Sequence, residues 1–304
     1  MRRMGLGCAV VAGALAFASC SSSEGSSPTT VDAPPCPTDA VEVVVTVNQW
    51  ADVVRHLGGA CTEVTTIIDG VDVDPHEFEP SPADSARFTS ADLVVMNGLG
   101  YDAWAERAVD TVSPRPPVVD AGRVVGREDG DNPHLWYSPD AVEQVADAVT
   151  TELQQLLPDA TSYLADQAAA WEEEMAPYRD EIASLRTTAT GKTYAATESV
   201  FDDMAAAVGL TDRTPSGYRS AALNESDPSP ADVNAFEQLL RDRGVDVLVV
   251  NTQTEGSIPE QIRGVAEAAG VAVVEVTEGV PAGSSSFVDW QVTQLRALHQ
   301  ALGG

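Results

Sequence analysis

The chain has 304 residues, 43% of them hydrophobic, and its 47 acidic side chains against 17 basic ones give a formal net charge of −30. A chain of this length and composition forms one or two globular domains with sizeable cores. The strongly negative charge argues against nucleic acid or an anionic lipid surface as the partner, whereas a cationic ligand is compatible with it.

The first 20 residues have the pattern of an export signal. Two arginines precede the apolar run 6–17, and two small residues stand directly before Cys20. The pattern resembles a bacterial lipoprotein signal peptide, in which Cys20 would carry the lipid. A transmembrane helix is the alternative, but the apolar run is short for a span. Residues 21–38 are rich in serine and proline, which predicts a flexible tether.

Two cysteines remain in the exported part of the chain, Cys36 and Cys61. They precede the predicted strands 41–47 and 62–68, and two adjacent parallel strands would bring both cysteines to one edge of a sheet. Cysteine pairs outside the cytoplasm commonly form disulfides. The sequence therefore predicts a Cys36–Cys61 bond, with two buried free thiols as the alternative.

Strands and helices alternate through the first half of the exported chain. Runs of β-branched residues predict strands, of which 62–68 is expected to be buried, and polar caps or Ser-Pro pairs predict helix starts. The predicted strands are 41–47, 62–68, 92–96 and 117–121, and the predicted helices start at Asn48, Ser81, Tyr101 and Asp140. This alternation is typical of a parallel sheet flanked by helices.

A long helical pattern at 160–185 separates this series from a second one, and Pro177 is expected to kink or divide it. The second series has predicted strands at 192–197, 245–250 and 271–276, each followed by a helix. We therefore predict an α/β fold with two Rossmann-like lobes, each with a mostly parallel sheet flanked by helices, joined by one long backbone helix. The predicted divisions are the signal peptide 1–20, the tether 21–38, the N-terminal lobe 39–157, the linking helix 158–188 and the C-terminal lobe 189–304.

Four polar residues follow predicted strands, two in each lobe: His76, His134, Glu198 and Glu278. Both histidines stand shortly before a Ser-Pro helix start. Ligands of open α/β sheets bind at the carboxyl ends of the strands, so two facing lobes would bring these side chains together. Two imidazoles and two carboxylates form a suitable ligand set for a divalent transition metal.

The loops around these four residues resemble those of the metal-binding solute-binding lipoproteins of ABC importers for manganese and zinc. The similarity covers nearly all of the chain after the tether. Residues 74–81 match the first ligand loop of that family, residues 132–136 the second and residues 197–201 the third, and residues 277–278 stand at the place of the fourth.

Glu198 is similar to the manganese-type members of the family, whereas zinc-type members often carry histidine there. Glu278 stands where the family commonly has aspartate, so the reach of this ligand differs from the family pattern. A histidine-rich loop, present in some zinc-type members, is absent from the chain, which has four histidines.

The resemblance implies a receptor and not an enzyme. Such a protein would be an extracytoplasmic monomer, anchored to the outer face of the cell membrane through a lipid on Cys20. It would bind one Zn²⁺ or Mn²⁺ as cargo between the lobes and deliver the ion to an ABC transporter permease. The alternatives are a surface adhesin with a structural metal and a metallohydrolase. A hydrolase needs an open coordination position, and the sequence contains neither His-Glu-x-x-His nor Gly-x-Ser-x-Gly.

Overall fold

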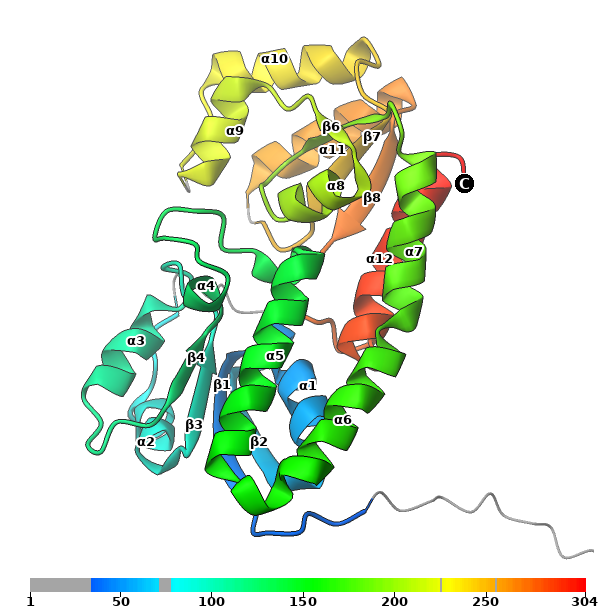
Figure 1. The fold of residues 1–304 in the computed structure, drawn as a ribbon. Coiled ribbons are helices and arrows are strands. Elements are labelled where there is room, and N and C mark those ends of the chain that lie inside the picture. Colours follow the sequence, from blue (N-terminus) through cyan, green and yellow to red (C-terminus); the bar gives the residue numbers. More distant parts are fainter. Residues whose placement is uncertain (1–33, 71–77, 225, 255) are drawn as a thin grey trace, which may run out of the picture. The chain divides into compact units, whose positions relative to one another are not determined.

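The structure of the protein is a computed structural model that describes residues 34–70, 78–224, 226–254 and 256–304. The predicted signal peptide with Cys20, most of the tether and the predicted ligand His76 lie outside these residues. Residues 35–304 form one compact unit. Within it, two parallel sheets are each flanked by helices (Figure 1).

The first sheet is built from β1 (Val41–Val47), β2 (Thr62–Ile68), β3 (Leu93–Met96) and β4 (Val118–Asp120), in the order β2-β1-β3-β4. All of its neighbouring strands are parallel. Four of the five valines of β1 are buried, all except Val41, because this strand lies inside the sheet. The prediction of a buried β2 is wrong, since this strand forms the edge of the sheet and most of its residues are only partly buried.

Capping residues set the starts of the helices that surround this sheet. Ser81 Oγ accepts a hydrogen bond from the amide of Asp84, whose carboxylate accepts one from the amide of Ser81 in return. At α1 the predicted cap is wrong: Val47 is the N-cap residue, and the Asn48 side chain lies elsewhere. The helices are α1 (Asn48–Gly58), η1 (Gly59–Cys61), α2 (Pro82–Ser90), α3 (Ala103–Asp110), α4 (Ala121–Val124), η2 (Leu135–Tyr137) and α5 (Pro139–Leu156).

The predicted long helix is divided in two. After the short turn η3 (Pro158–Ala160), α6 (Thr161–Glu174) ends before Met175, and α7 (Ala176–Thr188) begins directly after it. Pro177 lies in the first turn of α7, where its missing N–H breaks no helical hydrogen bond, so a proline is tolerated there and not in the middle of a helix.

The second sheet contains β5 (Thr193–Ala196), β6 (Thr211–Asp212), β7 (Val247–Asn251) and β8 (Ala272–Val276), in the order β6-β5-β7-β8. Its neighbouring strands are also parallel, and the order matches that of the first sheet. The sequence did not predict β6 or α9 within the connection 211–226. The helices of this lobe are α8 (Asp202–Val208), α9 (Ser216–Leu223), α10 (Pro230–Arg241), α11 (Ser257–Ala269) and α12 (Phe287–Ala301).

One hydrophobic core extends through both lobes. Val247 and Val249 of β7 belong to the same core as the valines of β1, whereas the alternate residues Leu248 and Val250 face a smaller second core. This alternation follows from the two-residue period of a strand. Trp290 of α12 is also buried in the shared core. None of the described helices is both long and apolar enough to span a membrane.

Candidate metal centre

Three of the four predicted ligands lie together. One ligand atom each from His134, Glu198 and Glu278 lies within 4.8 Å of the other two. His134 follows β4, Glu198 follows β5 and Glu278 follows β8, so both sheets contribute through the carboxyl ends of their strands. His134 and Glu278 are buried, and Glu198 is partly buried. The fourth predicted ligand, His76, lies outside the described residues.

A neighbouring amide orients the His134 ring. His134 Nδ1 lies 2.7 Å from Asn132 Oδ1, and the same oxygen accepts a hydrogen bond from the His134 backbone amide at 3.1 Å. Because the amide oxygen only accepts, Nδ1 carries a proton, so Nε2 is the nitrogen whose lone pair can bind a cation. Nε2 faces Glu278, 3.8 Å from Oε2. His134 is thereby prepared to bind a cation through Nε2.

Asn132 also connects the two lobes beside the site. Its Nδ2 donates to the carbonyl oxygen of Ser199 at 2.8 Å, in the loop that carries Glu198. One asparagine side chain therefore positions His134 and holds the loop of a second predicted ligand.

Tyr101 donates a hydrogen bond from the first lobe to Glu278 Oε2 at 3.0 Å. Burial, together with the negative charge of Glu278, raises the pKa of Tyr101 well above its usual value. The phenol is therefore protonated at physiological pH and acts as a donor to the carboxylate. Gln49 Nε2 donates to the Tyr101 oxygen at 3.2 Å and helps to hold the ring.

The loop that carries Glu278 is held by the first lobe. Asn48, which does not cap α1, donates from Nδ2 to the carbonyl oxygen of Val280 and accepts from its amide at Oδ1, both at 3.0 Å. Tyr137 donates to the carbonyl oxygen of Thr277 at 2.7 Å. These contacts bracket Glu278 in the chain, so its position depends on both lobes.

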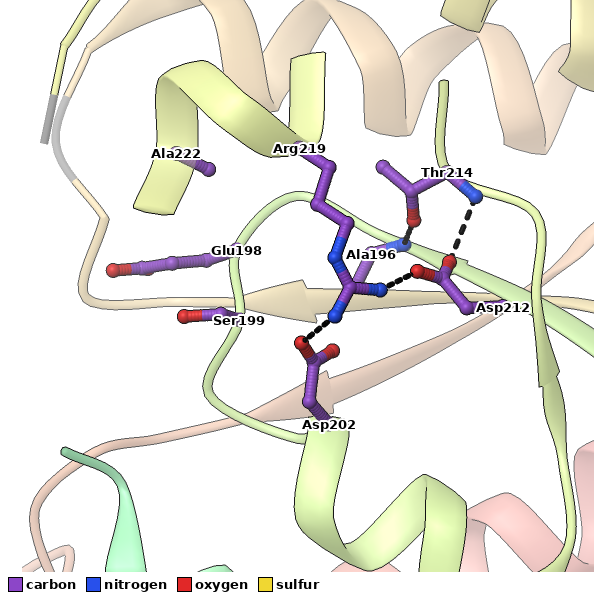
Figure 2. A pocket seen from close by; sticks show the side chains of 8 residues that line it. All are labelled: Ala196, Glu198, Ser199, Asp202, Asp212, Thr214, Arg219 and Ala222. Carbon is purple, nitrogen blue, oxygen red and sulfur yellow. Dashed lines mark hydrogen bonds and ion pairs between the residues drawn. The ribbon is translucent and has the colours of Figure 1, made fainter. Parts of the chain in front are cut away.

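Glu198 borders a pocket whose lining also includes an ion-paired arginine. Figure 2 shows Arg219 of α9 directed toward Asp202 and Asp212, while Glu198 points away from them. Arg219 lies 2.8 Å from Asp202 and also pairs with Asp212. The guanidinium therefore compensates one of these two negative charges, and Glu198 takes no part in this ion-pair cluster.

Sequence reasoning missed several residues that hold the ligands, among them Asn251. It is the last residue of β7, and its Nδ2 donates to Glu198 Oε2 at 2.6 Å and to Glu278 Oε1 at 2.8 Å. The rule that found the ligands could have found Asn251 as well, since it is a polar residue at the end of an otherwise apolar strand.

The described part of the site joins an imidazole nitrogen to two carboxylates, one buried and one partly buried. Two carboxylates that are both ionised repel each other at this separation unless a cation lies between them. A divalent transition metal would compensate both charges and accept the imidazole lone pair.

Residues 43–301 match a family model described as zinc-uptake complex component A, periplasmic. The protein belongs to this family. Its members are binding proteins for metal uptake and not enzymes. The family resemblance drawn from the ligand loops is thereby confirmed.

Relatives of this chain include two lipoproteins. A manganese-binding lipoprotein of Halalkalibacterium halodurans is 26% identical over 155 residues, which cover 49% of this chain and about half, 51%, of that protein. The manganese ABC transporter substrate-binding lipoprotein PsaA of Streptococcus pneumoniae is 24% identical over 236 residues, which cover 71% of this chain and 74% of that protein.

The fold is also shared with solved structures. The periplasmic zinc-binding protein TroA from Treponema pallidum superposes with a TM-score of 0.71 at 19% identity, over 87% of this chain and 100% of that chain. The prediction of two α/β lobes with parallel sheets is thereby confirmed.

Proposed function

We propose that the protein is a lipid-anchored extracytoplasmic receptor that binds one Zn²⁺ or Mn²⁺ between its lobes and delivers the ion to an ABC importer. The observation that carries this proposal is the convergence of His134, Glu198 and Glu278 within 4.8 Å at strand ends of both sheets. Family membership and relatives named as manganese-binding or zinc-binding proteins support the same function.

The proposed ligand set is His76, His134, Glu198 and Glu278. Two imidazoles and two carboxylates would compensate the charge of a divalent ion while filling a four-coordinate shell. A shell of four protein ligands leaves little room for the activated water of a metallohydrolase, which argues for capture and release of the ion.

The proposed attachment to the membrane uses the N-terminal segment. After cleavage before Cys20, this cysteine would be the first residue of the mature chain and carry the lipid, and the tether would connect it to the lobes at the outer face of the membrane. The protein would act there as a monomer beside its permease. Relatives named as lipoproteins of ABC transporters support this arrangement.

Elemental analysis of the protein isolated from its native cell envelope tests the proposal. We expect one zinc or manganese ion per chain and no hydrolysis of ester, phosphoester or peptide substrates by the loaded protein. A chain isolated without either metal, and not stabilised by adding either one, would contradict the proposed function. Hydrolysis that depends on the metal would favour the metallohydrolase instead.

A further inference from the structure

We propose that Asn251 restricts Glu198 and Glu278 to one metal-binding oxygen each and thereby favours Zn²⁺ over Mn²⁺. The inference rests on the proposed function and concerns the selectivity of the same site. Asn251 acts as a positioning residue, since its amide bonds to the ligands and not to the ion. It works against the preference for manganese that Glu198 indicates in the sequence.

The Asn251 side chain is fixed in one orientation. It is 3% exposed, and its Oδ1 accepts a hydrogen bond from the backbone amide of Gln253 at 3.1 Å. Because a backbone amide only donates and carboxylates only accept, the NH₂ group must face the two glutamates. The backbone amide of Asn251 donates to Thr197 Oγ1 at 3.3 Å, which ties the end of β7 to the end of β5.

Glu198 receives two donors on a single oxygen. Asn251 Nδ2 and Thr254 Oγ1 both donate to Oε2. A carboxylate oxygen has about two lone-pair sites, so these two hydrogen bonds use the sites of Oε2. A metal ion would then bind Glu198 through Oε1, and bidentate binding would require breaking both hydrogen bonds.

The two carboxylate oxygens of Glu278 also have different neighbours. Asn251 donates to Oε1 at 2.8 Å, whereas Tyr101 donates to Oε2 at 3.0 Å, the oxygen that lies 3.8 Å from His134 Nε2. Each oxygen keeps one lone-pair site, and an ion that binds Oε1 must compete with the hydrogen bond from Asn251. The oxygen on the histidine side is therefore the one placed to bind the same ion as the imidazole. The two hydrogens of the Asn251 amide thus each bond to one carboxylate oxygen, Oε2 of Glu198 and Oε1 of Glu278, and both compete with the ion for these oxygens.

This arrangement limits the number of donors. Two imidazoles and two single carboxylate oxygens give four donors, the number that Zn²⁺ prefers in tetrahedral sites. Mn²⁺ prefers oxygen ligands in an octahedral geometry, which bidentate glutamates would approach. Removing the Asn251 amide should therefore weaken Zn²⁺ binding and allow a higher coordination number.

The test compares Asn251→Ala with Asn234→Ala, the same change at an exposed position of α10. Dissociation constants for Zn²⁺ and Mn²⁺ are measured on the mature chain by competition with a chelating dye. Loss of a group that orients a metal ligand typically lowers affinity about 10- to 100-fold. We expect a loss in this range for Zn²⁺ and a smaller one for Mn²⁺ in Asn251→Ala, and no change in Asn234→Ala.

Co²⁺ gives a second readout, since four-coordinate Co²⁺ absorbs visible light much more strongly than six-coordinate Co²⁺. We expect strong visible bands in the wild type and weaker bands in Asn251→Ala. Thr254→Val removes the other donor to Glu198 with little change of shape. It should shift the spectrum and the Zn²⁺ to Mn²⁺ ratio in the same direction, and it carries the test if Asn251→Ala fails to fold.

An unchanged affinity ratio and Co²⁺ spectrum in folded Asn251→Ala, or in Thr254→Val alone, would overturn the inference. So would a six-coordinate spectrum in the wild type. In these cases the wild type still binds metal and the proposed function stands. A wild type that binds none of the three ions would overturn the proposed function, and this inference with it.

Discussion

Each of the three predicted ligand side chains that the structure describes accepts or donates a hydrogen bond that holds it in place. Asn132 fixes the proton of the His134 ring, Tyr101 donates to Glu278, and Asn251 donates to both glutamates. Such contacts lower the entropy that the ligands lose on binding an ion, because their rotamers are already restricted.

The change Tyr101→Phe should lower metal affinity roughly 10- to 100-fold, because Glu278 loses the donor that orients Oε2. Calorimetric titration of Zn²⁺ into the metal-stripped variant measures the effect. Tyr163→Phe is the matched control, since the Tyr163 oxygen accepts from the Ala60 amide, outside the site. Equal affinities of wild type and Tyr101→Phe would show that this hydrogen bond does not support binding.

The change Glu198→His should lower Mn²⁺ affinity more than Zn²⁺ affinity, because a neutral nitrogen replaces an anionic oxygen donor. Zn²⁺ should remain the tighter ligand in vitro in both proteins, since Mn²⁺ is lowest in the Irving–Williams order. Titration of both metals into both proteins measures the change. An equal loss for the two metals would mean that Glu198 does not set selectivity.

At the scale of single residues, the sequence predicted those site residues that follow the carboxyl ends of strands. His134, Glu198 and Glu278 stand after strands, where ligands of α/β sheets bind. The contact of Tyr101 with Glu278 joins residues 177 positions apart and depends on how the lobes meet. No local pattern encodes that distance.

At the scale of secondary-structure elements, a disulfide joins the segment before β1 to the end of η1. Cys36 and Cys61 are bonded in the structure, with 25 residues of sequence separation. In the chain-entropy model, closing a loop of this size stabilises the folded state by about 3 kcal/mol.

The double variant Cys36→Ser/Cys61→Ser should therefore lose about 3 kcal/mol of unfolding free energy in urea titrations. Metal affinity should change little, because the disulfide precedes β2 and the predicted ligands follow strands. Mass spectrometry of the native secreted form under non-reducing conditions checks the bond itself. Two thiols open to alkylation in that form would contradict it.

The elements that the sequence failed to predict are short or lack a periodic pattern. β6 has two residues, too few for an alternating pattern to be recognised. α9 contains Gly217, which weakens a helical pattern. By contrast, the helix predicted after the strand 245–250 is present as α11 (Ser257–Ala269), which has an apolar face and a glycine directly after its end.

On the scale of the whole molecule, the two lobes share one core, and the loop of Glu278 is bonded to the first lobe. A wide separation of the lobes would expose this core and break those hydrogen bonds. We therefore expect capture and release of the ion to involve small local movements. The shared core could not be predicted, because it gathers residues of β1, β7 and α12, which lie far apart in the chain.

The change Cys20→Ser should release the protein from membranes, because acyl chains on Cys20 would supply the stable anchor. Fractionation of cells that express the full chain measures this. Cys8→Ser makes the same substitution inside the predicted signal peptide and should leave the protein with the membrane. Retention of Cys20→Ser at the wild-type level would contradict lipid anchoring at this residue.

The central claim is that His76 and His134 both bind one divalent ion. The most direct test is whether the metal stabilises His76→Ala and His134→Ala against unfolding. An ion that binds only to the folded state, at a free concentration about 100 times its Kd, stabilises the protein by about 2.7 kcal/mol. Thermal unfolding with and without Zn²⁺ or Mn²⁺ should show this stabilisation in the wild type and in His299→Ala, whose ring pairs with Glu181 of α7. It should be largely lost in His76→Ala and in His134→Ala. If His76→Ala keeps the wild-type stabilisation, the proposed metal site is contradicted.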